Sequence, residues 1–431
     1  MPEKWWTALE SEVLNDLVDR ALKRSPTIAS AEAALRQAQE TAAAQRGAFF
    51  PSVQANYLPT HAHVSRATSS PLNSGASVYT LHTAQLSVGY VADVFGANRR
   101  SVESLDAQSE AASWQLRAAH LSLSSNVVNA ALQTASLREQ LTATERIVAI
   151  GTQQLKLLET QRRLGAAPGA AVFAQEAVLW QSEATALALR KQLAQQRDLL
   201  AVLAGMLPSD FSPLTLQLSA LRLPDIPLTL PADLVEHRPD VRIAEAQLHA
   251  ANAQVGLAVA NMLPQITLTG NYGASAEAFT ELFRAGGLMW IVGASLAQPV
   301  FEGGALLHRK RAAEAQVEQS LAQYQGVVLT AFQNVADSLE AARFDAEQYI
   351  ATNRQETAAE ASLRIARRQL ELGDVSYLAL LNAETSYLQA TIARIQAHSN
   401  RFSDVVAVYQ SLGGGWTQDS EQINGPSSGL R

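Results

Sequence analysis

The sequence contains no cysteine among its 431 residues. Disulfides, thiolate nucleophiles and cysteine-ligated metal sites are therefore excluded, although this absence fits either redox compartment. No run of about 18 consecutive apolar residues is present, which excludes a membrane-spanning helix but leaves a membrane-spanning strand open. The chain also lacks an excess of positive charge, and its formal net charge of -7 argues against nucleic acid as a partner.

Aromatic residues are scarce, at 6%, while alanine, glutamine, leucine and arginine dominate long stretches. This composition favours extended, closely packed helices over a core of large side chains. The N-terminal segment, MPEKWWTALE, lacks the basic and then apolar pattern of a secretion signal. We therefore expect either a protein that is not exported or a mature form to which a start methionine has been added.

The chain is predicted to be a tandem duplication. When Ala31 is aligned with Ala244 without gaps, Pro51 falls on Pro264. In the same register Pro26 falls on Pro239 and Val53 on Ile266. Further along the chain, RRLGAAPGAAVFAQEA matches QLELGDVSYLALLNAE in a register of its own, which places Gly165 on Gly373 and Glu176 on Glu384. A single duplication predicts two equivalent halves rather than a solenoid of short repeats.

Each half is predicted to contain a helix, two strands, a long helix, a turn and a return helix. The long helices carry no proline, and at 1.5 Å per residue each is roughly 100 Å long. The first half, 1–206, has strands at about 51–64 and 80–94, the long helix at 97–163 and the return helix at 170–203. The second half, 233–416, has strands at about 264–273 and 287–300, the long helix at 304–372 and the return helix at 376–412. Residues 207–232 form a proline-rich connector and 417–431 a disordered tail.

The four strand segments alternate with period two, and each is about as long as the 9 to 11 residues that a tilted strand needs to cross a bilayer. Each presents one apolar row with an aromatic residue, as in an outer-membrane barrel strand. The residues predicted to face lipid are Leu86, Val88, Tyr90, Ile266, Leu268, Tyr272, Trp290 and Leu296. Gln85, Thr267 and Ser295 are predicted to face a lumen. A soluble sheet with one wet face alternates in the same way, so the strands alone leave both interpretations open.

The need to close the sheet into a barrel favours the membrane interpretation, and it predicts that several chains assemble. Four strands cannot close into a barrel, and a bilayer does not tolerate unpaired strand edges. Because eight strands leave an interior that side chains fill, a water-filled conduit needs at least three chains, and a trimer with twelve strands is the smallest solution. Pro51 and Pro264 mark where helix gives way to strand, since proline ends helical hydrogen bonding.

These features together resemble a known family, the TolC/OprM-like outer-membrane factors, and specifically the NodT-type lineage that serves RND-type tripartite efflux pumps. The most telling segments are AEAQLHAANAQVGLAVANMLPQITLTG, PVFEGG and ELGDVSYLALLNAE, and the resemblance extends from Trp5 to Trp416. It implies a mainly α fold with a membrane β-barrel part: a homotrimeric twelve-stranded barrel on a long α-helical barrel, with an equatorial belt made by the termini and connector. Members of this branch usually carry a lipidated N-terminal cysteine, and since the sequence contains no cysteine, we expect that this anchor is missing or was removed.

The resemblance also implies the function and the partners. The expected function is passive conduction of drugs, metals or other small toxic compounds through the bacterial outer membrane, from a periplasmic membrane-fusion adaptor and an inner-membrane RND-type pump to the exterior. Such a duct, set in outer-membrane lipid and extending into the periplasm, needs no catalytic residue and no cofactor, and it binds no nucleic acid. The alternatives are the duct of a type I secretion system and, in a different class, a soluble coiled-coil scaffold or adaptor.

The helical hairpin tips are where the resemblance places adaptor contact. The matching residues are Arg163, Leu164, Gly165, Glu371, Leu372 and Gly373. The family's constricting residues lie just after the second tip, but the acidic residues common in relatives are replaced here by Ala171, Val375 and Asn382. The remaining gate candidates are Asp374, Tyr377, Leu378 and Leu381. Asp374 could cap the helix that follows Gly373, but a mixed gate is the favoured interpretation, in which Asp374 contributes charge at the mouth and one of the three apolar residues supplies the narrowing.

Three other residue groups carry side chains capable of metal binding, catalysis or charge interactions. His61, His63 and His82 could form a metal site near the external mouth, but polar loop-end residues are the favoured interpretation. Glu176 and Glu384 resemble a catalytic pair only because the duplication aligns them, so solvated or lumen-facing charges are expected. The pairs Arg162-Arg163 and Arg367-Arg368 are expected in the last helical turn before each tip glycine, where they complement the helix dipole, with adaptor or gate contacts as a second role.

Overall fold

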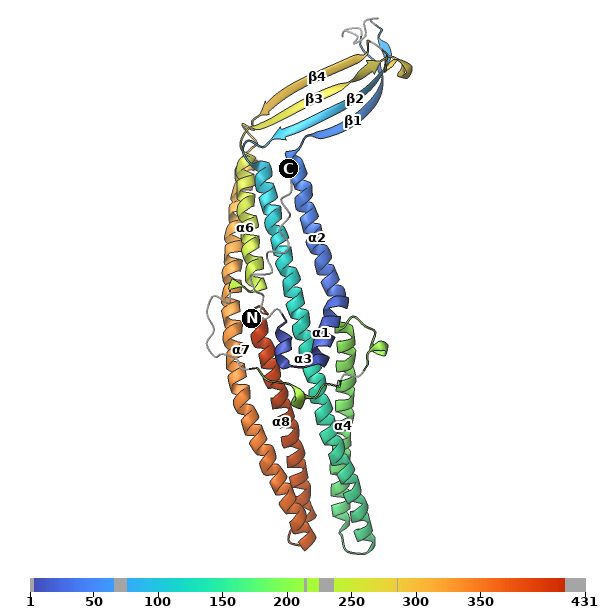
Figure 1. Ribbon diagram of the computed structural model, residues 1–431, viewed down its shortest axis with the longest axis vertical. Helices are drawn as coiled ribbons and strands as arrows, with labels where there is room; N and C mark the ends of the chain where they lie inside the picture. Colours follow the sequence, from blue (N-terminus) through green and yellow to red (C-terminus); the bar gives the residue numbers. More distant parts are fainter. Residues whose placement is uncertain (1–3, 66–75, 213–214, 225–235, 285, 415–431) are drawn as a thin grey trace. The chain divides into compact units, whose positions relative to one another are not determined.

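The computed structural model describes residues 4–65, 76–212, 215–224, 236–284 and 286–414 (Figure 1). The predicted connector lies partly, and the predicted tail at 417–431 wholly, outside these residues. Among the described residues, no helix combines the length and the apolar character needed to cross a membrane.

The helices of the first half are α1 (Glu12–Arg24), α2 (Pro26–Arg46), α3 (Ala97–Arg163) and α4 (Gly169–Leu203). Those of the second half are α6 (Pro239–Ala260), α7 (Ala305–Leu372) and α8 (Tyr377–Ser411). The strands are β1 (Ser52–His63), β2 (Val78–Ala92), β3 (Gln265–Ala276) and β4 (Leu288–Ala297).

The chain forms two compact units that do not coincide with the two sequence halves. The sheet unit comprises Ala34–Ser113 and Ile243–Gln325, so it combines equivalent parts of both repeats. The hairpin unit comprises Met1–Ala33, Trp114–Arg242 and Gly326–Arg431. Helices α3 and α7 run from one unit into the other.

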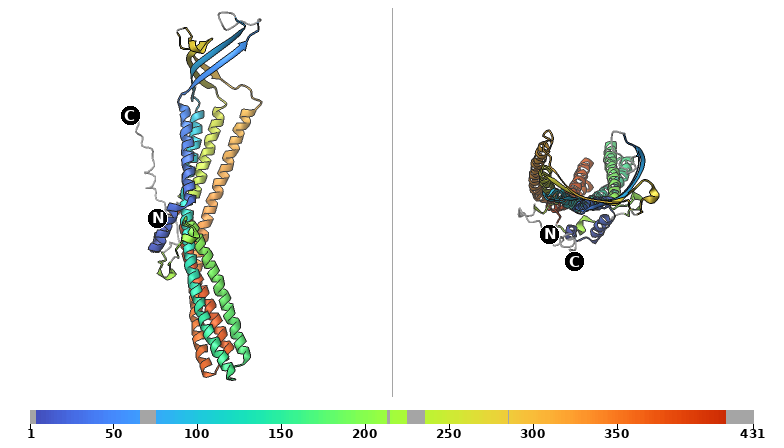
Figure 2. Two further views of the ribbon diagram at one scale, coloured as in Figure 1. Left: turned by 90° about the vertical axis from the view of Figure 1, so that its right-hand side faces the viewer. Right: turned by 90° about the horizontal axis from the view of Figure 1, so that it is seen from above.

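In the sheet unit, segments of α2, α3, α6 and α7 lie side by side beneath the strands (Figures 1 and 2). Small residues allow these helices to approach closely, because a Cβ on Gly256 of α6 would come within 2.9 Å of the Arg100 side chain on α3. Ser104 on α3 also donates a hydrogen bond to the carbonyl of Ala250 on α6 (3.2 Å). Each of these four helices is connected in sequence to one of the four strands.

The strands form one antiparallel sheet in the order β1-β2-β3-β4. Directly paired residues point to the same side of a sheet, so the register decides which side chains share a face. Ala55 pairs with Leu86, Leu86 with Tyr272, and Tyr272 with Trp290. The four apolar rows therefore lie on one face, which we call the apolar face.

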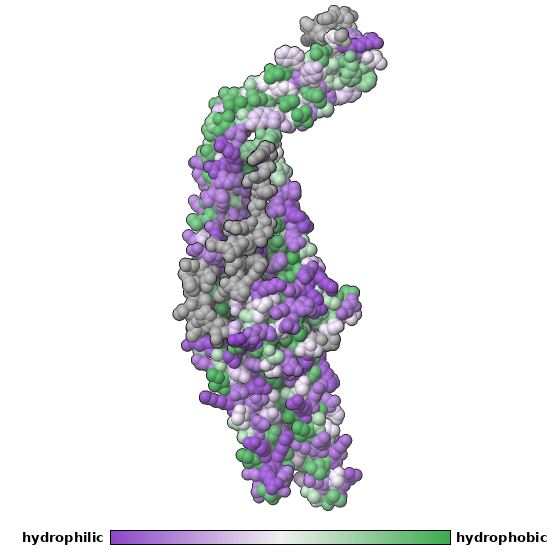
Figure 3. Space-filling model, in the orientation of Figure 1, coloured by the Kyte–Doolittle hydropathy of each residue, from purple (hydrophilic) through white to green (hydrophobic). Residues whose placement is uncertain are grey.

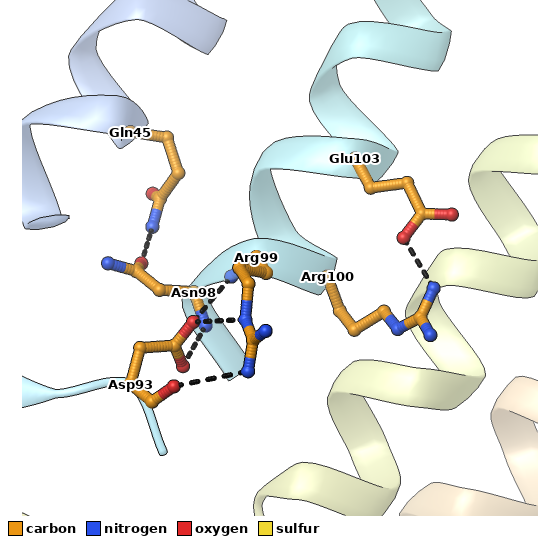
Figure 4. A network of polar contacts seen from close by, with 6 residues as sticks. All are labelled: Gln45, Asp93, Asn98, Arg99, Arg100 and Glu103. Atoms are coloured by element: carbon orange, nitrogen blue, oxygen red, sulfur yellow. Dashed lines mark hydrogen bonds and ion pairs between the residues drawn. The ribbon is translucent and has the colours of Figure 1, made fainter. Parts of the chain in front are cut away.

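Prolines precede two of the strands, and a side-chain cap marks the start of the first long helix. β1 and β3 begin one residue after Pro51 and Pro264. At the next junction, both carboxylate oxygens of Asp93 accept from backbone N–H groups in the first turn of α3, those of Asn98 and Arg99, each at 2.9 Å (Figure 4). Asp93 thereby satisfies donors that the helix itself leaves free.

The hairpin unit has an apolar core to which the N-terminal segment, the connector and the long hairpin helices all contribute. Trp5, Leu14 and Leu17 from the N-terminal segment pack with Leu132 of α3 and Phe402 of α8. Trp5 donates from Nε1 to Ser124 Oγ (3.3 Å) and stacks on Tyr409 (5.5 Å between ring centroids). Arg238, also buried, donates to the carbonyl of Ser411 (2.5 Å) near the end of α8. The N-terminal segment thus fastens α3 and α8 together.

Candidate functional site

Both hairpin tips end their long helix with the same backbone motif. Gly165 and Gly373 adopt left-handed conformations, with φ of 73° and 77°. The residue after each glycine donates five residues back, Ala166 to Gln161 (2.8 Å) and Asp374 to Gln369 (2.9 Å). The glycine itself donates three residues back, Gly165 to Arg162 and Gly373 to Leu370, both at 3.0 Å. The two hydrogen bonds at each tip satisfy terminal carbonyls of the helix, and the left-handed turn favours glycine. The duplication therefore preserves the geometry of both tips.

Of the two roles considered for Asp374, the helix cap is contradicted by the structure. Helix α8 begins at Tyr377 with Ser376 in the N-cap position, and the described first turn contains no acidic residue and no side-chain cap. The reason is the tip motif itself. The backbone N–H of Asp374 bonds to the Gln369 carbonyl at the end of α7, so Asp374 belongs to the tip and α8 begins only at Tyr377. The Asp374 carboxylate is left exposed.

The three apolar gate candidates differ in burial. Leu378 is exposed at the tip, whereas Leu381 is only 3% exposed and packs within the chain, where it presents no surface to an opening. Tyr377 is half-buried against a small cluster that includes Leu363 and Leu380. Burial raises the pKa of the Tyr377 phenol, and the nearby Glu384 charge raises it further. Of these three gate candidates, Leu378 is the exposed one.

A polar cluster around the buried Glu384 carboxylate, consisting of Gln154, Gln175, Arg367 and Glu384, links all four hairpin helices, and the Arg367 side chain in it is 41% exposed. Gln154 on α3 donates to the Glu384 carboxylate on α8 (2.5 Å), and Arg367 on α7 lies 3.4 Å from the same oxygen. Gln175 on α4 donates to Gln154 (3.3 Å) and to the carbonyl of Gly151 (3.0 Å). Hydrogen bonds to a buried charge contribute more than neutral ones. The cluster therefore holds α3 against α8.

The expectation that Glu384 is solvated or lumen-facing is wrong, because this side chain is 3% exposed. Glu176, its duplicate, is half-buried. Sequence reasoning missed the cluster because its four members come from four helices. The one available signal was the presence of charge at matched positions in both return helices.

The two arginine pairs differ in their position relative to the end of their helix. Arg162 and Arg163 lie in the last turn of α3, as expected from the helix dipole. The last turn of α7 holds no basic residue, so that expectation is wrong for Arg367 and Arg368. Arg367 instead reaches Glu384, and Arg368 pairs with Glu371 (2.7 Å).

A charged groove of about 830 Å³ opens between α3, α7 and α8 in the hairpin unit. Its lining includes Arg367 and Arg368 and reaches Glu371 near the second tip. Further basic lining residues are Arg138, Arg146, Arg364 and Arg394, and further acidic ones are Glu139, Glu356 and Glu360. Arginines therefore outnumber glutamates in this groove.

The sheet register places every residue predicted to face lipid on the apolar face. Leu86, Val88, Leu268, Tyr272, Trp290 and Leu296 are exposed, and Tyr90 and Ile266 are half-buried. Gln85, Thr267 and Ser295 lie on the opposite face. In Figure 3 the visible surface of the sheet is mostly green and white, whereas polar side chains dominate the helices.

The histidines at the far end of the sheet bond to other groups. His61 contacts Thr80 Oγ1 through Nδ1 (2.9 Å), and His82 contacts the Tyr57 hydroxyl through Nδ1 (2.8 Å). Across the part of the chain that the structure describes, no three side chains of histidine, aspartate or glutamate are grouped for metal binding.

The comparisons with known proteins agree with this geometry. The family model described as outer membrane efflux protein matches residues 17–206 and 230–414. The pyoverdine export outer membrane protein OpmQ of Pseudomonas putida is 28% identical over 97% of this chain and 89% of its own. Outer membrane protein OprJ of Pseudomonas aeruginosa is 30% identical over 76% of this chain and 69% of its own.

A solved structure gives the same result. The outer membrane protein VceC of Vibrio cholerae superimposes with a TM-score of 0.87 and 27% identity, covering 96% of this chain and 99% of VceC. The duplicated hairpins, the four-stranded sheet and these matches lead to one conclusion. The chain belongs to the outer membrane efflux protein family, and it is an efflux channel of the outer membrane with a TolC-like fold.

Proposed function

We propose that three copies of this chain form a passive exit duct. Its barrel crosses the outer membrane, and its hairpins receive cargo from a periplasmic membrane-fusion adaptor and an inner-membrane RND-type pump. The observation that carries the proposal is the single four-stranded sheet with two unpaired edges and one apolar face. The chain is the conduit in this arrangement, and the transport energy comes from the pump.

Closure between copies follows from strand direction. Strands β1 and β4 form the two edges and run in opposite directions, so β4 of one copy can pair antiparallel with β1 of the next. Head-to-tail contacts of this kind close into a ring, and ring closure removes every edge. Three copies supply twelve strands, enough for a water-filled interior.

The hairpin unit contains a second surface suited to a neighbouring copy. Phe173, Trp180 and Leu187 on α4 are spaced by seven residues and are all exposed. Residues at this spacing lie on one side of a helix and form the seam of coiled coils. Exposed apolar residues on α7 offer a matching surface, among them Phe332, Phe344 and Ile365.

The tips are the proposed adaptor contact and gate. Leu164 and Leu372 are exposed beside Gly165 and Gly373, next to Arg163 and Glu371. We place the apolar part of the constriction at Leu378 and retain Tyr377 as its half-buried support, with Asp374 contributing charge at the mouth. We also propose that the polar cluster around Glu384 restrains the gate, because it joins α3 to α8 close to the tips.

The proposal is tested by assembly and conduction together. The purified chain is expected to require detergent, to have the mass of a trimer, and to produce ion-conducting channels in planar bilayers. Mass measurement in detergent followed by conductance recording provides the test. A monodisperse monomer in plain buffer is incompatible with the barrel, and a non-conducting trimer is incompatible with the duct.

A further inference from the structure

The connection between β3 and β4 folds back onto the sheet. It contains a short 3-10 helix, η5 (Phe279–Glu281), and Phe279 packs edge-on against Tyr57 (5.8 Å between centroids) and His82 (6.3 Å). Leu282, which directly follows the end of η5, is 1% exposed. The segment from Phe279 to Arg284, which we call the flap, is thus fixed against the strands.

The flap covers the apolar face and not the opposite one. Tyr57 pairs with Ala84, and Ala84 with Ala274, so these residues share the face that carries Leu86 and Tyr272. Between flap and sheet lies a groove of about 590 Å³. Its main side-chain lining is apolar: Tyr57, Leu86, Tyr272, Leu282, Phe283 and Leu288.

The flap also extends the apolar face where the strands become polar. Beyond the row of Tyr57 and Ala84, the next pairs on that face are Pro59 with His82 and His61 with Thr80. Phe279 covers His82, and Phe283 is 85% exposed. Large exposed aromatic side chains are unfavourable in water, but they suit the boundary between acyl chains and headgroups.

We propose that the flap is a lipid-binding element: the groove beneath it takes an acyl chain of an outer-leaflet lipid, and Phe283 lies at the headgroup boundary. The inference rests on the proposed orientation of the apolar face toward lipid. The groove is continuous with that face, since Leu86 and Tyr272 belong to both. The flap also lies at the strand ends farthest from the helices (Figure 1), where the outer leaflet is expected.

The absence of native cysteine permits a direct test. One fluorophore is attached to each of three single-cysteine variants, Phe283→Cys, Val292→Cys and Thr269→Cys. The labelled trimers are reconstituted with phospholipids that bear a nitroxide quencher, either near the headgroup or near the end of the acyl chain. Val292 lies on the apolar face and Thr269 on the opposite one. The probe at position 283 is expected to lose most of its fluorescence to the nitroxide near the headgroup and much less to the one near the chain end.

The two controls separate this inference from the proposed function. Quenching of the probe at 292, but not at 269, by the chain-end nitroxide means that the sheet faces lipid as proposed. With those controls satisfied, a probe at 283 quenched only by aqueous iodide would place the flap in water. A probe at 283 protected from both iodide and lipid nitroxides would mean that protein covers it. Either result would overturn the lipid-binding flap.

Discussion

At the scale of single residues, the hydrogen bond that Gln154 donates to Glu384 joins α3 to α8. Gln154→Ala removes the 2.5 Å donor and leaves a buried carboxylate with Arg367 at 3.4 Å. Loss of a hydrogen bond to a charged group costs about 1.5–3 kcal/mol. We therefore expect Gln154→Ala to raise the conductance of the resting channel in planar bilayers.

The matched control is Gln153→Ala, because Gln153 is exposed on the same helix. It removes an amide of equal size without touching Glu384, and its conductance is expected to stay at the wild-type level. Equal conductance of wild type, Gln153→Ala and Gln154→Ala would show that the polar cluster does not restrain the gate.

A second residue-scale prediction concerns Asp404 on α8. Burial raises the pKa of this carboxyl to about 7, and the neighbouring Asp345 charge contributes. Since the unfolded value is about 3.9, the folded protein binds this proton more tightly, so stability falls as pH rises from about 4 to about 7 and then levels off. Asp404→Asn removes this penalty. The melting temperature should therefore rise more at pH above 7 than near pH 4, and an equal change at both would contradict the assignment.

At the scale of elements, the sheet has two faces that differ in their tolerance of charge. Leu268 lies on the apolar face, and Thr267, its neighbour in β3, lies on the other. Arginine on a lipid-facing position near the bilayer midplane costs about 2–4 kcal/mol. Leu268→Arg should thus reduce barrel stability by about this amount, while Thr267→Arg should have a much smaller effect. Denaturant unfolding in detergent or lipid measures both, and equal losses would mean that the faces are assigned wrongly.

At the scale of the whole molecule, the stripe formed by Phe173, Trp180 and Leu187 is expected to be buried only in the assembly. Trp180 is 61% exposed in the single chain. A charge there would have to be desolvated between copies, so Trp180→Asp is expected to shift the detergent-solubilised protein from trimer to smaller species. Gln192→Asp adds the same charge at an exposed position of α4 outside the stripe and should leave the trimer intact. Sedimentation in detergent compares the two, and a stable Trp180→Asp trimer would remove this stripe from the interface.

Local sequence patterns determined the element order, the four strands and the family. Proline positions, proline-free stretches and period-two alternation act within a few residues, so they could be read without knowing what lies nearby. The strand rows at Leu86, Leu268 and Trp290 were predictable for this reason, as were the tip glycines. The tertiary structure alone decided the rest, because burial depends on partners that are distant in sequence. Glu384 is buried by Gln154, 230 residues away, and Leu381 is enclosed by helix packing. The flap lies over the sheet because Phe279 meets Tyr57 and His82, two side chains brought together only by strand pairing.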